Sequence, residues 1–167
     1  MSMPGLVAMW AGGGTMRPIS VAFTGTPGSH SNDGNAYDTD PNTFATVSSA
    51  VSGATSSYTA TYTIGAAPAG VLSVAITTAT MFVVSDNGLN EATTDATVQY
   101  ALDGSTWTLL DLGSGGSELD YSSPITASIG AASNLLVRVT CSYVRIGTGL
   151  GLAIASSSAD IYDIKLN

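Results

Sequence analysis

The sequence predicts an all-β fold, an antiparallel β-sandwich of the jelly-roll type, and three observations carry this prediction. Segments of alternating or β-branched residues recur along the chain at close spacing. The joints between them carry the Gly, Asn, Asp and Ser residues that turns require. No window of about a dozen residues keeps the apolar spacing of an amphipathic helix without Gly, Pro or a dense Ser/Thr cluster inside it.

The expected strands follow one another from residue 20 to the end of the chain. In "YTATYTI", residues 58–64, tyrosine, alanine and isoleucine alternate with threonine, which predicts one buried and one solvated sheet face. Residues 149–159, "GLGLAIASSSA", either continue a strand or bend around a bulge. In order, the expected strands span residues 20–25, 56–65, 71–85, 96–103, 107–113, 123–130, 134–147 and 159–167.

Residues 1–19 form an apolar, Gly-rich arm ahead of a single sandwich domain, residues 20–167. The arm places Met9 and Trp10 before three glycines, and such a segment cannot bury its apolar side chains by itself. We expect it to dock on this domain or on a neighbouring subunit, with Met9 and Trp10 as partner-binding residues. The alternative is a first strand followed by a loop.

Composition excludes several classes of protein. Twelve acidic residues against four basic ones give a net charge of −8; with no basic stripe, we expect no nucleic acid as a partner. No run reaches the roughly 18 apolar residues of a membrane span, so we expect no membrane insertion. The Ser/Thr-rich, weakly charged composition suits extracellular exposure, yet the N-terminus lacks the basic region of a classical signal peptide.

Catalytic groups are scarce, so we expect a protein that is not an enzyme and has no catalytic residues. His30 is the single histidine and Cys141 the single cysteine, too few for a zinc site. The apolar neighbours of Cys141 predict a buried strand residue rather than a nucleophile. His30 lies in the polar stretch "TPGSHSNDG", which favours a solvated turn. A hydrolase that depends on His30 or on a loop aspartate is the remaining enzymatic alternative.

The stretch "NAYDTDPNTFA", residues 35–45, is the candidate metal site. Asp38, Asp40 and Asn42 alternate and Thr43 adds a hydroxyl, a pattern that offers the oxygen ligands that calcium takes. The alternative is a self-bonded Asx turn that starts the next strand. A second stretch, "DGSTW", predicts a tight hairpin corner at Asp103-Gly104, followed by a strand in which Trp107 anchors the core rather than stacking on a ligand.

Three stretches resemble the discoidin and galactose-binding-like superfamily of β-sandwich domains: "AYDTDPNTFA" (36–45), "VQYALDGSTWTLL" (98–110) and "SSADIYDIKLN" (157–167). The chain departs from the first family motif at Thr39, where a glycine is usual, and at Ala45, where a tryptophan is usual. The resemblance spans residues 20–167 and implies sugar binding by some members. It also implies a structural calcium ion held by Asp38, Asp40, Asn42 or Thr43 with Asp160 or Asp163.

The N-terminal "GLVAMWAGG" resembles the "W-A-G" openings of phage tail-collar and fibre proteins. Our leading prediction is a virion structural protein of a bacteriophage, either a capsid decoration or cement protein or a tail-fibre component that contacts the host. It rests on the extracellular type of composition without a signal peptide, disulfides or catalytic groups, together with the apolar, Gly-rich arm. Its expected partners are other virion proteins and further copies of itself, for example in a trimer, with a cell-surface glycan as a further ligand. The alternative is a carbohydrate-binding module of a secreted, extracellular protein.

Overall fold

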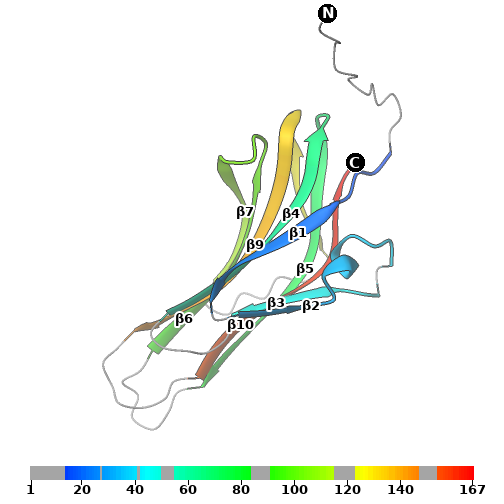
Figure 1. Ribbon diagram of the computed structural model, residues 1–167. Coiled ribbons are helices and arrows are strands. Elements are labelled where there is room, and N and C mark those ends of the chain that lie inside the picture. The colour runs from blue at the N-terminus through cyan, green and yellow to red at the C-terminus, as the bar shows by residue number, and fades with distance from the viewer. Residues whose placement is uncertain are drawn as a thin grey trace, which may run out of the picture.

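The computed structural model describes residues 14–26, 28–40, 42–49, 55–83, 91–114, 123–146 and 154–167. These residues form two five-stranded antiparallel sheets that face each other (Figure 1), which confirms the predicted antiparallel β-sandwich. No helix among them is long and apolar enough to cross a membrane. Met9 and Trp10 lie outside the described residues, so their expected role in partner binding stays a prediction.

Sheet 1 contains five of the strands expected from the sequence. Its central strand β9 and the adjacent β4 carry alternating side chains that face the core on one side and solvent on the other. In spatial order, sheet 1 consists of β1 (Ser20–Thr26), β4 (Thr55–Ala67), β9 (Ala132–Ile146), β6 (Glu91–Ala101) and β7 (Trp107–Ser114).

Sheet 2 contains two short strands that the sequence did not predict, β2 and β3, which flank the 3-10 turn η1 (Asp33–Ala36). For the described part of residues 149–159, the structure shows a strand, because residues 154–159 continue directly into the last strand; residues 149–153 lie outside the described residues. In spatial order, sheet 2 consists of β2 (Gly28–Ser31), β3 (Ala45–Ser49), β10 (Ile154–Leu166), β5 (Gly70–Val83) and β8 (Ile125–Ile129).

The core between the sheets follows the predicted alternation. On β4, Tyr58 and Tyr62 are buried, whereas Thr59 and Thr61 lie on the outer side of sheet 1 and are half-buried. Facing them, Ile76 of β5 is buried on the inner side of sheet 2. The largest fully buried side chains are Tyr62, Leu72, Ile76, Leu135, Ile161, Ile164, Leu166, Val47, Val74, Val98, Val137 and Val139.

Cys141 is buried in this core, as predicted. Its thiol lies 3.4 Å from the carbonyl oxygen of Val47 on the opposite sheet. Burial raises the pKa of Cys141 to about 12. The thiol is therefore protonated at neutral pH and is not a nucleophile.

A stack of aromatic rings lies at the edge of the sandwich where the chain passes from β1 to β2. The Phe23 and His30 rings are parallel within 4° with centroids 3.6 Å apart, and His30 Nδ1 lies 2.7 Å from Tyr58 Oη. Gly28 is required here, because a Cβ at that position would lie 2.1 Å from the Tyr58 ring. His30 is thus exposed, as we expected, but it lies in a strand and contacts both sheets, rather than lying in a turn.

The hairpin corner predicted at Asp103 and Gly104 is present between β6 and β7. Asp103 Oδ1 accepts hydrogen bonds from the Ser105 and Thr106 backbone N–H groups at 2.8 and 2.6 Å, and Gly104 takes a φ of +78°. The Thr106 hydroxyl donates to the second carboxylate oxygen at 2.7 Å. These donors, the Thr106 N–H first, hold the pKa of Asp103 well below its usual range.

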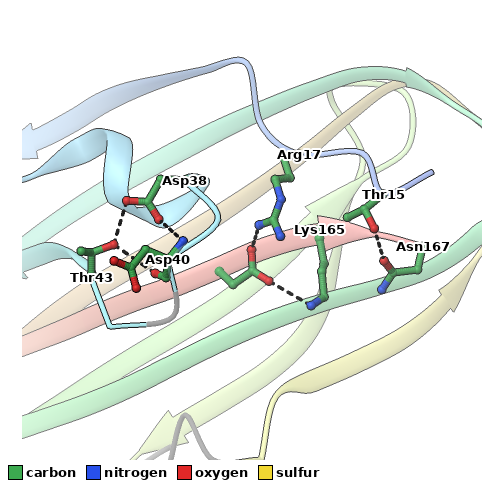
Figure 2. A network of polar contacts seen from close by, with 8 residues as sticks. Thr15, Arg17, Asp38, Asp40, Thr43, Lys165 and Asn167 are labelled. Carbon is green, nitrogen blue, oxygen red and sulfur yellow. Dashed lines mark hydrogen bonds and ion pairs between the residues drawn. The ribbon is translucent and has the colours of Figure 1, made fainter.

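Residues 14–17 pair with the end of the last strand. The backbone N–H of Met16 donates to the carbonyl of Leu166 at 2.8 Å, and the reverse bond has the same length. The Thr15 hydroxyl donates to Asn167 Oδ1 at 2.8 Å. Figure 2 shows the bond between Thr15 and Asn167, with Arg17 beside the last strand.

Candidate functional site

A small polar pocket lies where the loop between η1 and β3 meets β10 (Figure 2). Its volume is about 170 Å³. Three parts of the chain build it: the segment before β1, the loop that contains the candidate metal residues, and the last strand. The lining residues are Arg17, Asp38, Thr39, Asp40, Tyr162, Asp163 and Lys165.

The loop wall is held by its own hydrogen bonds. Asp38 accepts the Asp40 backbone N–H at 2.9 Å on one carboxylate oxygen and the Thr43 hydroxyl at 2.7 Å on the other. Asp40 Oδ1 accepts both the backbone N–H and the side-chain amide of Asn42 at 2.9 Å. The bonds from Asn42 lower the pKa of Asp40. This is the arrangement of consecutive Asx turns, and it fixes both carboxylates in place.

The opposite wall depends on a β-bulge in β10. The pairing of β10 with β5 shifts between Ile161 and Asp163. Ile161 and Ile164 are both fully buried, so Tyr162 and Asp163 both lie away from the core, which a regular strand does not allow for consecutive residues. The bulge therefore places the Tyr162 ring and the Asp163 carboxylate next to each other at the pocket.

Asp163 organises the cations of this wall. Arg17 Nη1 donates to Asp163 Oδ1, and Lys165 Nζ lies 3.1 Å from Asp163 Oδ2. All three side chains are partly exposed, so these ion pairs orient the groups more than they stabilise the fold. Behind them, the Tyr162 ring contacts the Phe44 ring with centroids 5.2 Å apart.

The charges of the pocket almost cancel. Three carboxylates and two cationic groups line it, which leaves a formal charge of −1. Both hydrogen-bond donors and acceptors therefore line the cavity, together with an aromatic side chain. Such a lining suits a small ligand that carries many hydroxyl groups and no large charge of its own.

The structure gathers four of the five predicted metal ligands, Asp38, Asp40, Asn42 and Thr43, in one loop. The fifth, Asp160, does not line the pocket, because its Oδ1 accepts the Thr46 hydroxyl at 2.8 Å on the neighbouring strand. Among the described residues, no three His, Cys, Asp or Glu side chains are placed to hold a metal ion. The geometry favours the Asx turn, and the structural calcium ion stays a prediction.

Sequence reasoning missed four residues of this pocket: Arg17, Thr39, Tyr162 and Lys165. For Arg17 and Lys165, the sequence offered one signal, namely that the chain has only four basic residues. Two of these four line the pocket. Tyr162 carried no such signal, because its orientation depends on the bulge.

The prediction for Trp107 was wrong. Its side chain is half-buried outside the core between the sheets, and the guanidinium carbon of Arg138 lies 4.0 Å from the centroid of its ring. The reason lies in the strand's position. β7 is the edge of sheet 1, and its register places Trp107 opposite Ala101, which faces outward.

No protein-family model matches the chain, and no curated protein matches it. Among solved structures, the chain is similar to the CBM32 of AlyQ in complex with 4,5-unsaturated mannuronic acid. The two chains are 15% identical with a TM-score of 0.41, and the match covers 92% of this chain and 97% of the other.

Proposed function

We propose that this chain is a non-catalytic carbohydrate-binding domain that holds one sugar ring in the pocket between the Asp38–Asp40 loop and β10. The observation that carries the proposal is the lining itself. One aromatic ring lies beside two cations and three carboxylates that are already oriented by their own contacts.

Each wall contributes a different part of sugar recognition. Sugar hydroxyls both donate and accept, so carboxylates at Asp38 and Asp40 accept from them while Arg17 and Lys165 donate to them. The apolar C–H face of the ring packs on Tyr162.

Orientation before binding lowers the entropic cost of this recognition. The loop carboxylates are held by Asx turns, and Asp163 holds both cations, so few side chains must be ordered when a ligand enters. A monosaccharide has about twelve non-hydrogen atoms, and about 0.3 kcal/mol per atom gives roughly 3.6 kcal/mol, which corresponds to millimolar affinity.

The test is a titration with neutral monosaccharides, beginning with galactose. Binding is monitored through the amide chemical shifts of the protein in NMR spectra. We expect shifts at residues 38–40 and 162–165, loss of binding in Tyr162→Ala, and retained binding in Tyr162→Phe, which keeps the ring. Ser128→Ala, an exposed position on β8 outside the pocket, is the matched control and should bind as the unchanged protein does. If no sugar binds at tens of millimolar, or if Tyr162→Ala binds normally, the proposal fails.

A virion structural role remains the second candidate, favoured by exposed apolar residues near the terminus that would carry subunit contacts. Ile19 is 76% and Val71 43% exposed, and both lie close to the pairing of Met16 with Leu166, Val71 through its bond to Asn167. Deletion of residues 1–13 spares that pairing. Under this role, the intact chain forms oligomers that the deletion weakens, as light scattering would measure; a monomeric intact chain argues against it.

A further inference from the structure

A cluster of three side chains lies on the outer face of sheet 1, and the pocket does not use it. Arg138 of β9 stacks on Trp107 of β7, with its guanidinium carbon 4.0 Å from the ring centroid. Its Nε–H donates to Gln99 Oε1 of β6 at 2.7 Å. We call Gln99, Trp107 and Arg138 the Arg138 platform.

The pairing register of β6, β7 and β9 brings the three side chains of this platform together. Gln99 lies directly opposite Arg138, and Trp107 lies opposite Ala101, two residues further along β6. Ala101 is fully buried although it points away from the core, and we attribute this to the indole of its cross-strand partner Trp107. Leu109, the next outward residue on β7, is 53% exposed. The platform is thus a surface, bordered by an exposed apolar side chain.

The guanidinium of Arg138 is oriented but not neutralised. Both of its contacts, Gln99 and Trp107, are uncharged. Among the side chains that the structure describes, no carboxylate forms an ion pair with Arg138, whereas Arg17 and Lys165 share Asp163. The stack and the bond to Nε hold the guanidinium plane, and the two η nitrogens have no described acceptor. A guanidinium held in this way presents a fork that fits a carboxylate.

The surroundings of the platform are hydroxyl-rich and, where described, free of carboxylates. One cross-strand row carries Thr24, Thr59, Thr140 and Thr97, and the Thr59 and Thr140 hydroxyl oxygens lie 2.9 Å apart. Thr61 lies directly opposite Arg138 on β4. In a chain of net charge −8, this face therefore offers an anion one positive group and a row of hydroxyls.

We propose that the Arg138 platform is a second binding site, separate from the pocket, for an acidic saccharide chain. The η nitrogens of Arg138 bind a uronate carboxylate as a fork, and hydroxyls of the same saccharide bond to the threonine row on the outer face of sheet 1. Trp107 keeps the guanidinium group of Arg138 in a fixed orientation, and its ring supplies an apolar contact for the saccharide. This site requires nothing of the pocket, so either proposal can fail alone.

The test uses Tyr162→Ala as the parent protein, so that the pocket does not contribute. Oligogalacturonate and a neutral galacto-oligosaccharide of equal length are titrated at low salt. We expect tighter binding of oligogalacturonate, and a loss of about tenfold or more in Arg138→Gln, because a charge-assisted hydrogen-bonded pair disappears. Arg138→Lys should restore only part of the affinity, because it keeps the charge but not the fork. Ser48→Ala, on the outer face of sheet 2, is the matched control.

Tryptophan fluorescence is a second measurement, and it tests whether the ligand binds beside Trp107. The chain has two tryptophans, so Trp10→Phe leaves Trp107 as the single source of tryptophan fluorescence, which oligogalacturonate should change. Equal affinity for the neutral oligosaccharide, or unchanged affinity in Arg138→Gln, overturns the proposal. So does equal binding of a poly-glutamate peptide, which would assign the platform to an acidic protein partner, or of sulfate, which would show a general anion site.

Discussion

Replacing Tyr62 by phenylalanine should make the protein more stable. The Tyr62 side chain is fully buried, and its hydroxyl is one of two buried side-chain polar atoms, with Asp33 Oδ1, that have no hydrogen-bond partner among the described residues. Burial raises the pKa of Tyr62, so the group removed is a neutral hydroxyl. The edge-on contact with the Tyr37 ring, with centroids 6.4 Å apart, involves only the ring and survives the change.

The magnitude follows from the cost of burying an unpaired polar group, about 1–3 kcal/mol. Removing that cost in Tyr62→Phe raises the free energy of unfolding by the same amount. For a chain of this length, each kcal/mol moves the melting temperature by about 2–4 °C, which gives an increase of about 2–12 °C. Thermal unfolding followed by circular dichroism at neutral pH measures it.

Tyr58→Phe is the matched control on the same face of the same strand. The Tyr58 hydroxyl lies 2.7 Å from His30 Nδ1, so its removal breaks a hydrogen bond and should lower the free energy of unfolding by about 0.5–1.5 kcal/mol. The two variants should therefore shift the melting temperature in opposite directions. If Tyr62→Phe loses as much stability as Tyr58→Phe, the Tyr62 hydroxyl has a partner and the reasoning is refuted.

Three further predictions concern Asp103, Cys141 and the Asp38–Asp40 loop. Asp103→Asn should lower the melting temperature at pH 7 and by a smaller amount at about pH 3. A folded pKa below the unfolded value of about 3.9 stabilises fully above that value, and the contribution decreases as pH falls from there toward the folded pKa. An equal deficit at both pH values contradicts this. Cys141 should resist a thiol reagent at pH 8 in the folded protein and react at once in guanidinium, because the thiol is buried and its pKa is raised; rapid labelling of folded protein would disprove it. Calcium and chelator should leave the melting temperature unchanged, because two cations line the pocket and, among the described residues, no three His, Cys, Asp or Glu side chains are placed to hold a metal ion; a calcium-dependent rise that Asp38→Asn abolishes would establish the predicted metal site.

Local patterns in the sequence predicted the features that depend on neighbouring residues. The alternation in β4 placed Tyr58 and Tyr62 in the core, and Asp103-Gly104 marked the corner between β6 and β7. Both follow from period-two geometry or turn chemistry, which a few consecutive residues determine. The sequence did not predict the short strands β2 and β3, because their Ser-rich sequences give little apolar alternation. Their order depends on long-range pairing, of β3 with β10 and of β2 with β3.

The sequence by itself determined the fold class and much of the core, because successive residues of a strand point to opposite faces of the sheet. Alternating apolar and polar residues therefore show which face is buried. Only the tertiary structure decided the two candidate sites. Arg17 meets Asp163 from 146 positions away, and a bulge places Tyr162 beside Asp163 on the outside of β10. Likewise, the register of an edge strand, rather than hydrophobicity, placed Trp107 against Arg138. Long-range pairing and register set these contacts, and neither leaves a periodic signal in the chain.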